Sequence, residues 1–154
     1  MNNANIEAYW LQYLATLPEQ ERNITYVAER FGDSPELADE LAALIVKGVK
    51  TATCSCLWQW ESENEQLPTP GEIAVVLDGA GQPKCIIETT EVTVRNFDDI
   101  DEEFAAAEGE GDRSLAYWRD AHWQFFGRAL PKIGKEPALD TPLVCERFRV
   151  IYSS

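Results

Sequence analysis

The chain has 154 residues, of which 27 are acidic and 13 basic, so its formal net charge is −14 at pH 7. A hydrophobic content of 45% and five tryptophans are sufficient for one folded domain with a real core. Proteins that bind long nucleic acids neutralise phosphates with Lys and Arg, so the acidity excludes a broad, non-specific binder of this kind. Binding of a short RNA or a free nucleoside in a locally basic pocket is still compatible with this acidity.

The sequence carries no sign of membrane insertion or export. No run approaches the roughly 18 apolar residues of a membrane span. Residues 1–5 lack the basic and apolar regions of a signal peptide. We therefore expect a cytoplasmic protein that has no membrane partner.

The cysteines do not predict a metal centre. They form no C-x-x-C pair, and only His122 could add an imidazole ligand. We expect reduced thiols that pack as small apolar groups at Cys54, Cys56, Cys85 and Cys145.

Two helices are predicted in the first third of the chain. Residues 5–17 carry apolar side chains at helical spacing, and Pro18 ends this helix. Residues 34–47 form the clearest helix, because Ser34 can cap its start and Gly48 follows its last turn.

The sequence then becomes typical of β-structure. We predict strands over residues 52–60, 72–77, 84–94 and 144–152, with a hairpin turn at 78–81. Helices that alternate with antiparallel strands favour an α+β fold whose strands curl into a small barrel.

Two further helices complete the expected fold. They cover residues 101–107 and 114–130, and Ser114 is the expected N-cap of the second. We expect residues 1–154 to form a single domain, with residues 1–30 as an N-terminal helical extension.

The helix-to-strand junction G-V-K-T-A-T, residues 48–53, carries the first candidate chemistry. Lys50 can act as a base or an electrostatic clamp, and the Thr53 hydroxyl as a nucleophile. A lysine beside a glutamate stays protonated, so it is better suited to orienting a group or stabilising an oxyanion. The alternative is a solvated lysine and a threonine that only starts a strand. Extended backbone would point the two side chains in opposite directions, so one shared pocket requires a turn at 48–51.

The second candidate segment, residues 108–114, places acidic side chains between glycines. Glu108, Glu110 and Asp112 could bring a carboxylate to a ligand, gather a divalent ion such as Mg²⁺, or form a flexible acidic loop.

The aromatic helix that follows leaves two readings open. His122 shares a face with Trp118, as a satisfied core histidine or as a catalyst. Tyr117, Trp118 and Trp123 could stack a base or belong to the core.

Taken in chain order, the segments described above resemble those of the ASCH domain family, a branch of the PUA-like fold. Residues 48–53 match its G-x-K-x-x-T signature, and the resemblance covers residues 30–152. Residues 108–115 with Trp118, His122 and Phe126 resemble the longer bacterial subgroup. The remaining matching segments are residues 70–72, 85–92, 97–98 and 144–148.

The resemblance implies a small PUA-like β-barrel with flanking helices and a cleft beside residues 48–53. Family members are regarded as RNA-related, and short members act as amidohydrolases on N4-acylated cytidine. Their lysine, threonine and glutamate match Lys50, Thr53 and Glu108. The expected substrate-binding residues are Gly48, Thr51, Ser114, Trp118 and His122.

Three functions follow from these observations. The first is an amidohydrolase for a modified nucleoside, in which Thr53 attacks the acyl carbon, Lys50 handles the proton or the oxyanion, and Glu108 orients Lys50. It needs no cofactor.

The second is a metal-dependent ribonuclease, which has Lys50 and Ser114 in common with family members of that activity and needs a divalent ion. It also needs a basic strip formed by Arg128, Lys132, Lys135, Arg147 and Arg149. The third is a non-catalytic RNA- or nucleotide-binding module. We infer no stable protein partner.

Overall fold

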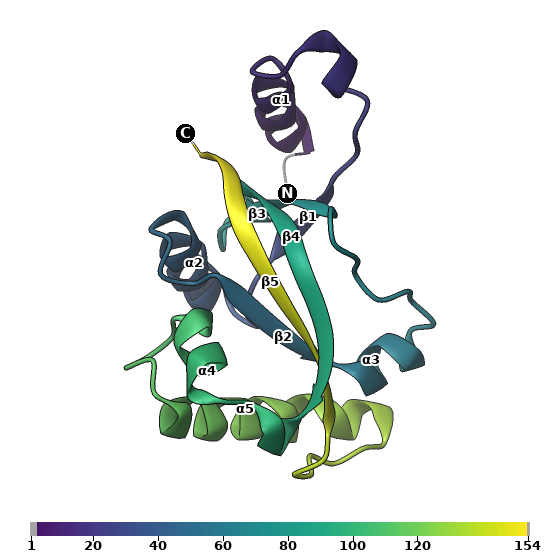
Figure 1. The fold of residues 1–154 in the computed structure, drawn as a ribbon, viewed down its shortest axis with the longest axis vertical. Coiled ribbons are helices and arrows are strands. Elements are labelled where there is room, and N and C mark those ends of the chain that lie inside the picture. Colours follow the sequence, from purple (N-terminus) through teal and green to yellow (C-terminus); the bar gives the residue numbers. More distant parts are fainter. Residues whose placement is uncertain (1–2, 154) are drawn as a thin grey trace.

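The structure is a computed structural model that describes residues 3–153, built around one five-stranded sheet with the strand order β1–β3–β4–β5–β2. β1 runs parallel to β3, and the other neighbouring strands are antiparallel. The sheet curls into a half-barrel (Figure 1), which confirms the expected α+β fold of curled strands and flanking helices. The strands are β1 (Val27–Arg30), β2 (Ala52–Cys56), β3 (Ile73–Leu77), β4 (Pro83–Asn96) and β5 (Pro142–Ser153).

Helices pack around this sheet and divide the core into three clusters. Figure 1 shows α1 at one end of the molecule and α5 across the opposite end, with α2 beside the sheet. The helices are α1 (Asn3–Leu14), α2 (Pro35–Val46), α3 (Leu57–Ser62), α4 (Glu102–Glu108) and α5 (Leu115–Ala129), with short 3₁₀ turns at Glu19–Glu21, Phe97–Asp99 and Leu130–Ile133. Among the residues described, no helix is both long and apolar enough to cross a bilayer.

The two largest helices begin as their sequences predict. The Ser34 side chain accepts a hydrogen bond from the Leu37 backbone N–H at the start of α2. Ser114 does the same for Tyr117 at the start of α5. Each hydroxyl satisfies a backbone donor that the first helical turn leaves unpaired.

The N-terminal boundary differs from the prediction. Residues 1–30 were expected to form a helical extension, but residues 27–30 form β1, which pairs with Ala74 to Leu77 of β3. All four residues of β1 are exposed, and its sequence Val-Ala-Glu-Arg does not alternate between apolar and polar side chains. A parallel partner more than forty residues away leaves no local trace in the sequence.

The strand expected over residues 52–60 is also shorter. β2 ends at Cys56, and α3 takes the next six residues. Trp58 packs against the cluster beneath α5, and the Trp60 indole donates to the Ser55 hydroxyl at 2.8 Å. Tertiary packing of the two tryptophans thus overrides their preference for strands.

The docking of α1 onto the sheet generates a stability prediction. Trp10 is 4% exposed and packs with Val75 and Ile86, whereas its neighbour Leu11 is 54% exposed. We expect Trp10→Ala to lower the free energy of unfolding by about 3–5 kcal/mol, since it removes a buried aromatic side chain. Leu11→Ala is the matched control and should change it by less than about 0.5 kcal/mol. Urea denaturation measures both, and equal effects would contradict the docking of α1.

Candidate functional site

The site begins at the turn between α2 and β2. Gly48 has φ +77°, and the backbone N–H groups of Val49 and Lys50 both donate to the Leu44 carbonyl, at 3.0 and 3.1 Å. This is the turn that the sequence required at residues 48–51. It carries the Lys50 side chain into the interior, where Lys50 is 2% exposed.

The buried ammonium of Lys50 has a full set of acceptors. Its Nζ lies 2.8 Å from Glu108 Oε1, 3.0 Å from Glu110 Oε2 and 2.9 Å from the Ala52 carbonyl oxygen. Burial alone would lower the pKa of Lys50, but the charges of Glu108 and Glu110 outweigh it and hold the pKa above its usual value. Lys50 is therefore an ammonium with its three protons engaged, and not a free base.

Glu108, the last residue of α4, connects Lys50 to α5. Its second oxygen, Oε2, accepts a hydrogen bond from the Trp118 indole at 2.9 Å and lies 3.3 Å from His122 Nε2. Burial opposes ionisation, but Lys50 and then His122 hold the pKa of Glu108 well below its usual range. Glu108 is thus a carboxylate at neutral pH, and two cations share it.

Close backbone packing fixes Glu108 against the Lys50 segment. Gly109 has φ +75°, and a Cβ at this position would lie 2.6 Å from the Val49 carbonyl oxygen. The Thr51 N–H donates to the Ala107 carbonyl at 2.7 Å. Only glycine satisfies both the left-handed backbone and the close approach.

His122 is held in one orientation by its other ring nitrogen. Nδ1 lies 2.9 Å from the Trp118 carbonyl, and the ring stacks on the Trp118 indole at 4.2 Å between centroids. Burial lowers the pKa of His122, but its hydrogen bond to Glu108 and the charge of Glu108 outweigh this and raise the pKa above the usual value. The ring is therefore stabilised as an imidazolium.

These groups face a cavity of about 220 Å³ that lies between α2 and α5. Lys50, Thr53, Glu108 and His122 all line it, so the turn before β2 does bring positions 50 and 53 to one cavity. Among the described residues, no group forms a hydrogen bond with the Thr53 hydroxyl. The other lining residues are Phe31, Gly32, Leu37, Leu41, Cys54, Glu110, Tyr117, Ala121, Phe125 and Arg128.

Four residues expected to bind substrate lie outside this cavity wall. Gly48 and Thr51 line a separate hollow beside β5, and Ser114 caps α5. Trp118 is 2% exposed and lies behind Glu108. The structure therefore does not bring these four residues to the cavity that Lys50 and Thr53 line.

The sequence indicated Tyr117 as a possible base-stacking residue, but it did not single out Ala121 and Phe125 of the cavity wall, although one signal was available. Tyr117, Ala121, Phe125 and Arg128 follow one face of α5 at helical spacing. The contribution of Leu37 and Leu41 from α2 depends on tertiary packing and has no such signal.

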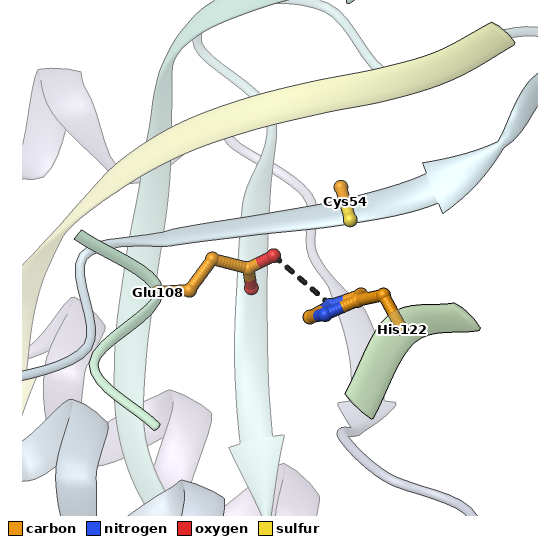
Figure 2. Close-up of side chains that lie close together, drawn as sticks. All are labelled: Cys54, Glu108 and His122. Carbon is orange, nitrogen blue, oxygen red and sulfur yellow. Dashed lines mark ion pairs between the residues drawn. The ribbon is translucent and has the colours of Figure 1, made fainter. Parts of the chain in front are cut away.

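Cys54, Glu108 and His122 form a group whose ligand atoms lie within 4.8 Å of one another, and Figure 2 shows them meeting from β2, α4 and α5. Such a donor set can bind zinc. Here Lys50 already neutralises Glu108, and burial followed by the charge of Glu108 raises the pKa of the Cys54 thiol well above its usual value. A cation bound here would have to compete with the Lys50 ammonium for Glu108 and displace the protons of Cys54 and His122.

The acidic segment does not gather as a divalent-ion site requires. Glu108 and Glu110 both pair with Lys50, while Asp112 accepts a hydrogen bond from the Ser114 N–H. Among the residues described, these three carboxylates are not within ligand distance of a common point.

Four of the five residues expected to form the basic strip of a ribonuclease are already engaged by other side chains. Arg128 pairs with Asp33, and Arg149 pairs with Glu88. Arg147 pairs with Glu91 and Glu103, so its charge is also balanced. Lys135 lies over the Trp58 ring.

Comparisons with known proteins agree with this architecture. The crystal structure of an ASCH domain from Lactobacillus crispatus JV V101 is 36% identical, has a TM-score of 0.93, and the match covers 99% of this chain and 96% of that one. Protein EF3133 from Enterococcus faecalis V583 is 37% identical with a TM-score of 0.88, over 97% of this chain and 90% of that one. Hypothetical protein PH0355, at 18% identity and a TM-score of 0.51 over 73% and 93%, shares the fold alone. No curated protein matches the chain.

The family model for the ASCH domain matches residues 27–152, which begins at the first residue of β1 and ends within β5. This match spans most of the chain, and two solved structures exceed 30% identity along nearly its whole length. The chain belongs to the ASCH domain family.

Proposed function

We propose that the protein is an amidohydrolase that removes the acyl group from an N4-acylated cytidine or a similar modified nucleoside. The observation that carries this proposal is that Lys50, Thr53 and Glu108 line one cavity of about 220 Å³. This volume is below the roughly 300–1,000 Å³ typical of drug-sized ligand pockets, and it favours a small guest.

The three residues divide the work by their chemistry. The Thr53 hydroxyl, which has no hydrogen-bond partner within the described chain, attacks the acyl carbon. The Lys50 ammonium stabilises the oxyanion that forms, and Glu108 holds Lys50 in place at 2.8 Å.

In the free protein the protons of the Lys50 ammonium already have acceptors, so the carbonyl oxygen of the substrate must displace one of these acceptors to bind Lys50. Glu110 is the partner of Lys50 that reaches solvent, with 23% of its side chain exposed against 2% for Glu108. Glu110 also lies between Gly109 and Gly111, both at positive φ. We infer that the substrate oxygen replaces Glu110 on Lys50 while Glu108 stays bound.

The charge balance favours a nucleoside over a polymer. Lys50 and a protonated His122 balance Glu108 and Glu110, so in that state the four groups at the polar end of the cavity carry no net charge. The whole chain has a net charge of −14, which repels phosphates but not a neutral nucleoside. The association of the ASCH family with RNA is compatible with a modified nucleoside as an RNA breakdown product.

The nucleophile can be tested with isosteric variants. We expect Thr53→Val to lower the release of acetate from N4-acetylcytidine by about 10³-fold or more, because it removes the attacking oxygen and keeps the shape. Thr53→Ser should retain measurable activity, and Thr90→Val, an exposed β4 residue outside the cavity, should match the wild type.

Three outcomes would contradict this proposal. Full activity of Thr53→Val would exclude Thr53 as the nucleophile. Cleavage of a short RNA that stops when the metal is chelated would support the ribonuclease instead. Salt-dependent RNA binding without any product would support the binding module.

The charge state of the cluster gives an independent prediction. His122 is the sole histidine in the sequence, so its ring protons give one assignable NMR titration. We expect its pKa to lie above the usual 6.5 in the wild type. In Glu108→Gln burial remains but the carboxylate, which accounts for the two largest raising causes, is gone, so the pKa of His122 should fall relative to the wild type.

The same shift has a consequence for stability. The folded pKa is raised, so the stabilisation from His122 is complete below pH 6.5 and is lost as the pH rises through the folded value. A wild-type pKa at or below 6.5 would contradict the imidazolium assignment.

A further inference from the structure

The proposed reaction needs a base for Thr53, and the groups nearest to it in the cavity do not supply one. Lys50 is an ammonium with its protons engaged. Both ring nitrogens of His122 already face acceptors, Glu108 Oε2 at 3.3 Å and the Trp118 carbonyl oxygen at 2.9 Å, so neither is free to take the Thr53 proton. The Cys54 thiol is held in its protonated form by burial, which raises its pKa. A base has to come from another face of β2.

The sheet register places a carboxyl group opposite Thr53. Thr53 of β2 pairs with Glu146 of β5 in the antiparallel ladder. Directly opposed residues of such a pair project on the same face, with Cβ atoms about 4.5–5.5 Å apart. Thr53 and Glu146 also line one small cavity on the concave side of the half-barrel.

Thr53 lies between this small cavity and the larger one. It lines both, with Phe31 as the other shared residue. The small cavity measures about 10 Å³, which is close to the volume needed for a single water molecule. A whole nucleoside cannot enter it, so Glu146 is not placed to recognise the base or the sugar, and only the reacting atoms at Thr53 or a water molecule can approach it.

The surroundings of Glu146 contain no positive charge to hold it ionised. Among the described residues, its half-buried side chain takes part in no ion pair or hydrogen bond. The groups that face it are Glu29 of β1, Glu72 before β3 and the neutral Thr89 of β4, and its register partner on β4 is Val92.

Burial and the neighbouring carboxylates determine the pKa of Glu146. Burial, and then the charges of Glu29 and Glu72, raise the pKa of Glu146 to about 7. A carboxyl group in this range both accepts and returns a proton efficiently near neutral pH. A structural carboxylate would instead be expected to have a cation or a backbone N–H as its partner.

We propose that Glu146 is the general base that accepts the Thr53 proton during hydrolysis of the acylated nucleoside. This inference rests on the function proposed above. In the free protein Glu146 and Thr53 share the small cavity without a hydrogen bond between their side chains, and the proposal brings them into contact, directly or through one water, when the substrate is bound.

The steps balance with water as the co-reactant. Glu146 takes the Thr53 hydroxyl proton while the Thr53 oxygen bonds to the acyl carbon. The carbon–N4 bond then breaks, and N4 takes the proton from Glu146, so the nucleoside leaves with its amine restored. Glu146 next takes a proton from water as the hydroxide oxygen attacks the acyl-threonine ester. The ester bond breaks, the Thr53 oxygen regains a proton from Glu146, and the carboxylic acid leaves.

The test is the pH dependence of kcat/KM for N4-acetylcytidine. For the wild type we expect a rise through a limb near pH 7. Glu146→Gln should lose that limb and lower kcat by about 10²–10⁴-fold with little change in KM, because binding does not involve Glu146. Glu29→Gln removes one repelling charge and should move the limb to lower pH with kcat retained.

Unfolding can be separated from loss of the base. A carboxyl whose folded pKa is raised destabilises the fold once the pH exceeds its unfolded value, so Glu146→Gln should melt at or above the wild-type temperature at pH 8. Reduced activity in this variant therefore reports on chemistry.

The possible failures are distinct. Wild-type-like kcat and an unchanged limb in Glu146→Gln, with Thr53→Val inactive, would overturn the role of Glu146 and leave the proposed function standing. A limb that stays in place in Glu29→Gln would also count against Glu146 as its source. Failure of the wild type to hydrolyse any N-acylated nucleoside would overturn the proposed function, and the base assignment with it.

Discussion

The structure of the site depends on one buried ion pair, between Lys50 and Glu108, at 2.8 Å and with both side chains almost fully buried. Removing two charges from water is costly, and their attraction compensates only when the remaining hydrogen-bonding capacity is also used. Lys50 meets this condition through the Ala52 carbonyl and Glu110, and Glu108 meets it through Trp118 and His122. Loss of either partner would leave an uncompensated charge, which costs about 3–5 kcal/mol. The pair therefore fixes the position of α4 and α5 against the start of β2.

Two glutamates of the same site have opposite acidities for a simple physical reason. Lys50 and His122 surround Glu108 and keep it ionised. Glu146 has only carboxylates as charged neighbours and loses part of its hydration, so it holds its proton up to about neutral pH. Thr53 adjoins both environments, since it lines both cavities. A fixed anion on one side and a titrating carboxyl on the other is an arrangement suited to separating electrostatic support from proton transfer.

The local features of this site could be predicted from the sequence, whereas the contacts between distant residues could not be predicted from spacing alone. The cap at Ser34, the turn at Gly48 and the spacing of Lys50 and Thr53 are local, and the structure has each of them. The contact of Lys50 with Glu108 spans 58 positions, so the family resemblance and not the spacing indicated it. The pairing of Thr53 with Glu146 depends on strand register, which a sequence alone does not fix. In the sequence Glu146 interrupts a face of the final strand that carries Val144, Phe148, Val150 and Tyr152, which gives no sign of its partner.

The half-barrel ends at β1 and β2, and each of these strands has one neighbour in the sheet. The side chains of Leu37 and Leu41 in α2, and not a sixth strand, complete the wall of the larger cavity beside β2. Its depth is therefore set by side-chain volume, and replacing either leucine with a smaller residue would enlarge the space without breaking a backbone hydrogen bond of the sheet. For the proposed amidohydrolase, single substitutions on this one helix would therefore change which acyl chains fit, while Lys50 and Glu108 stay where they are.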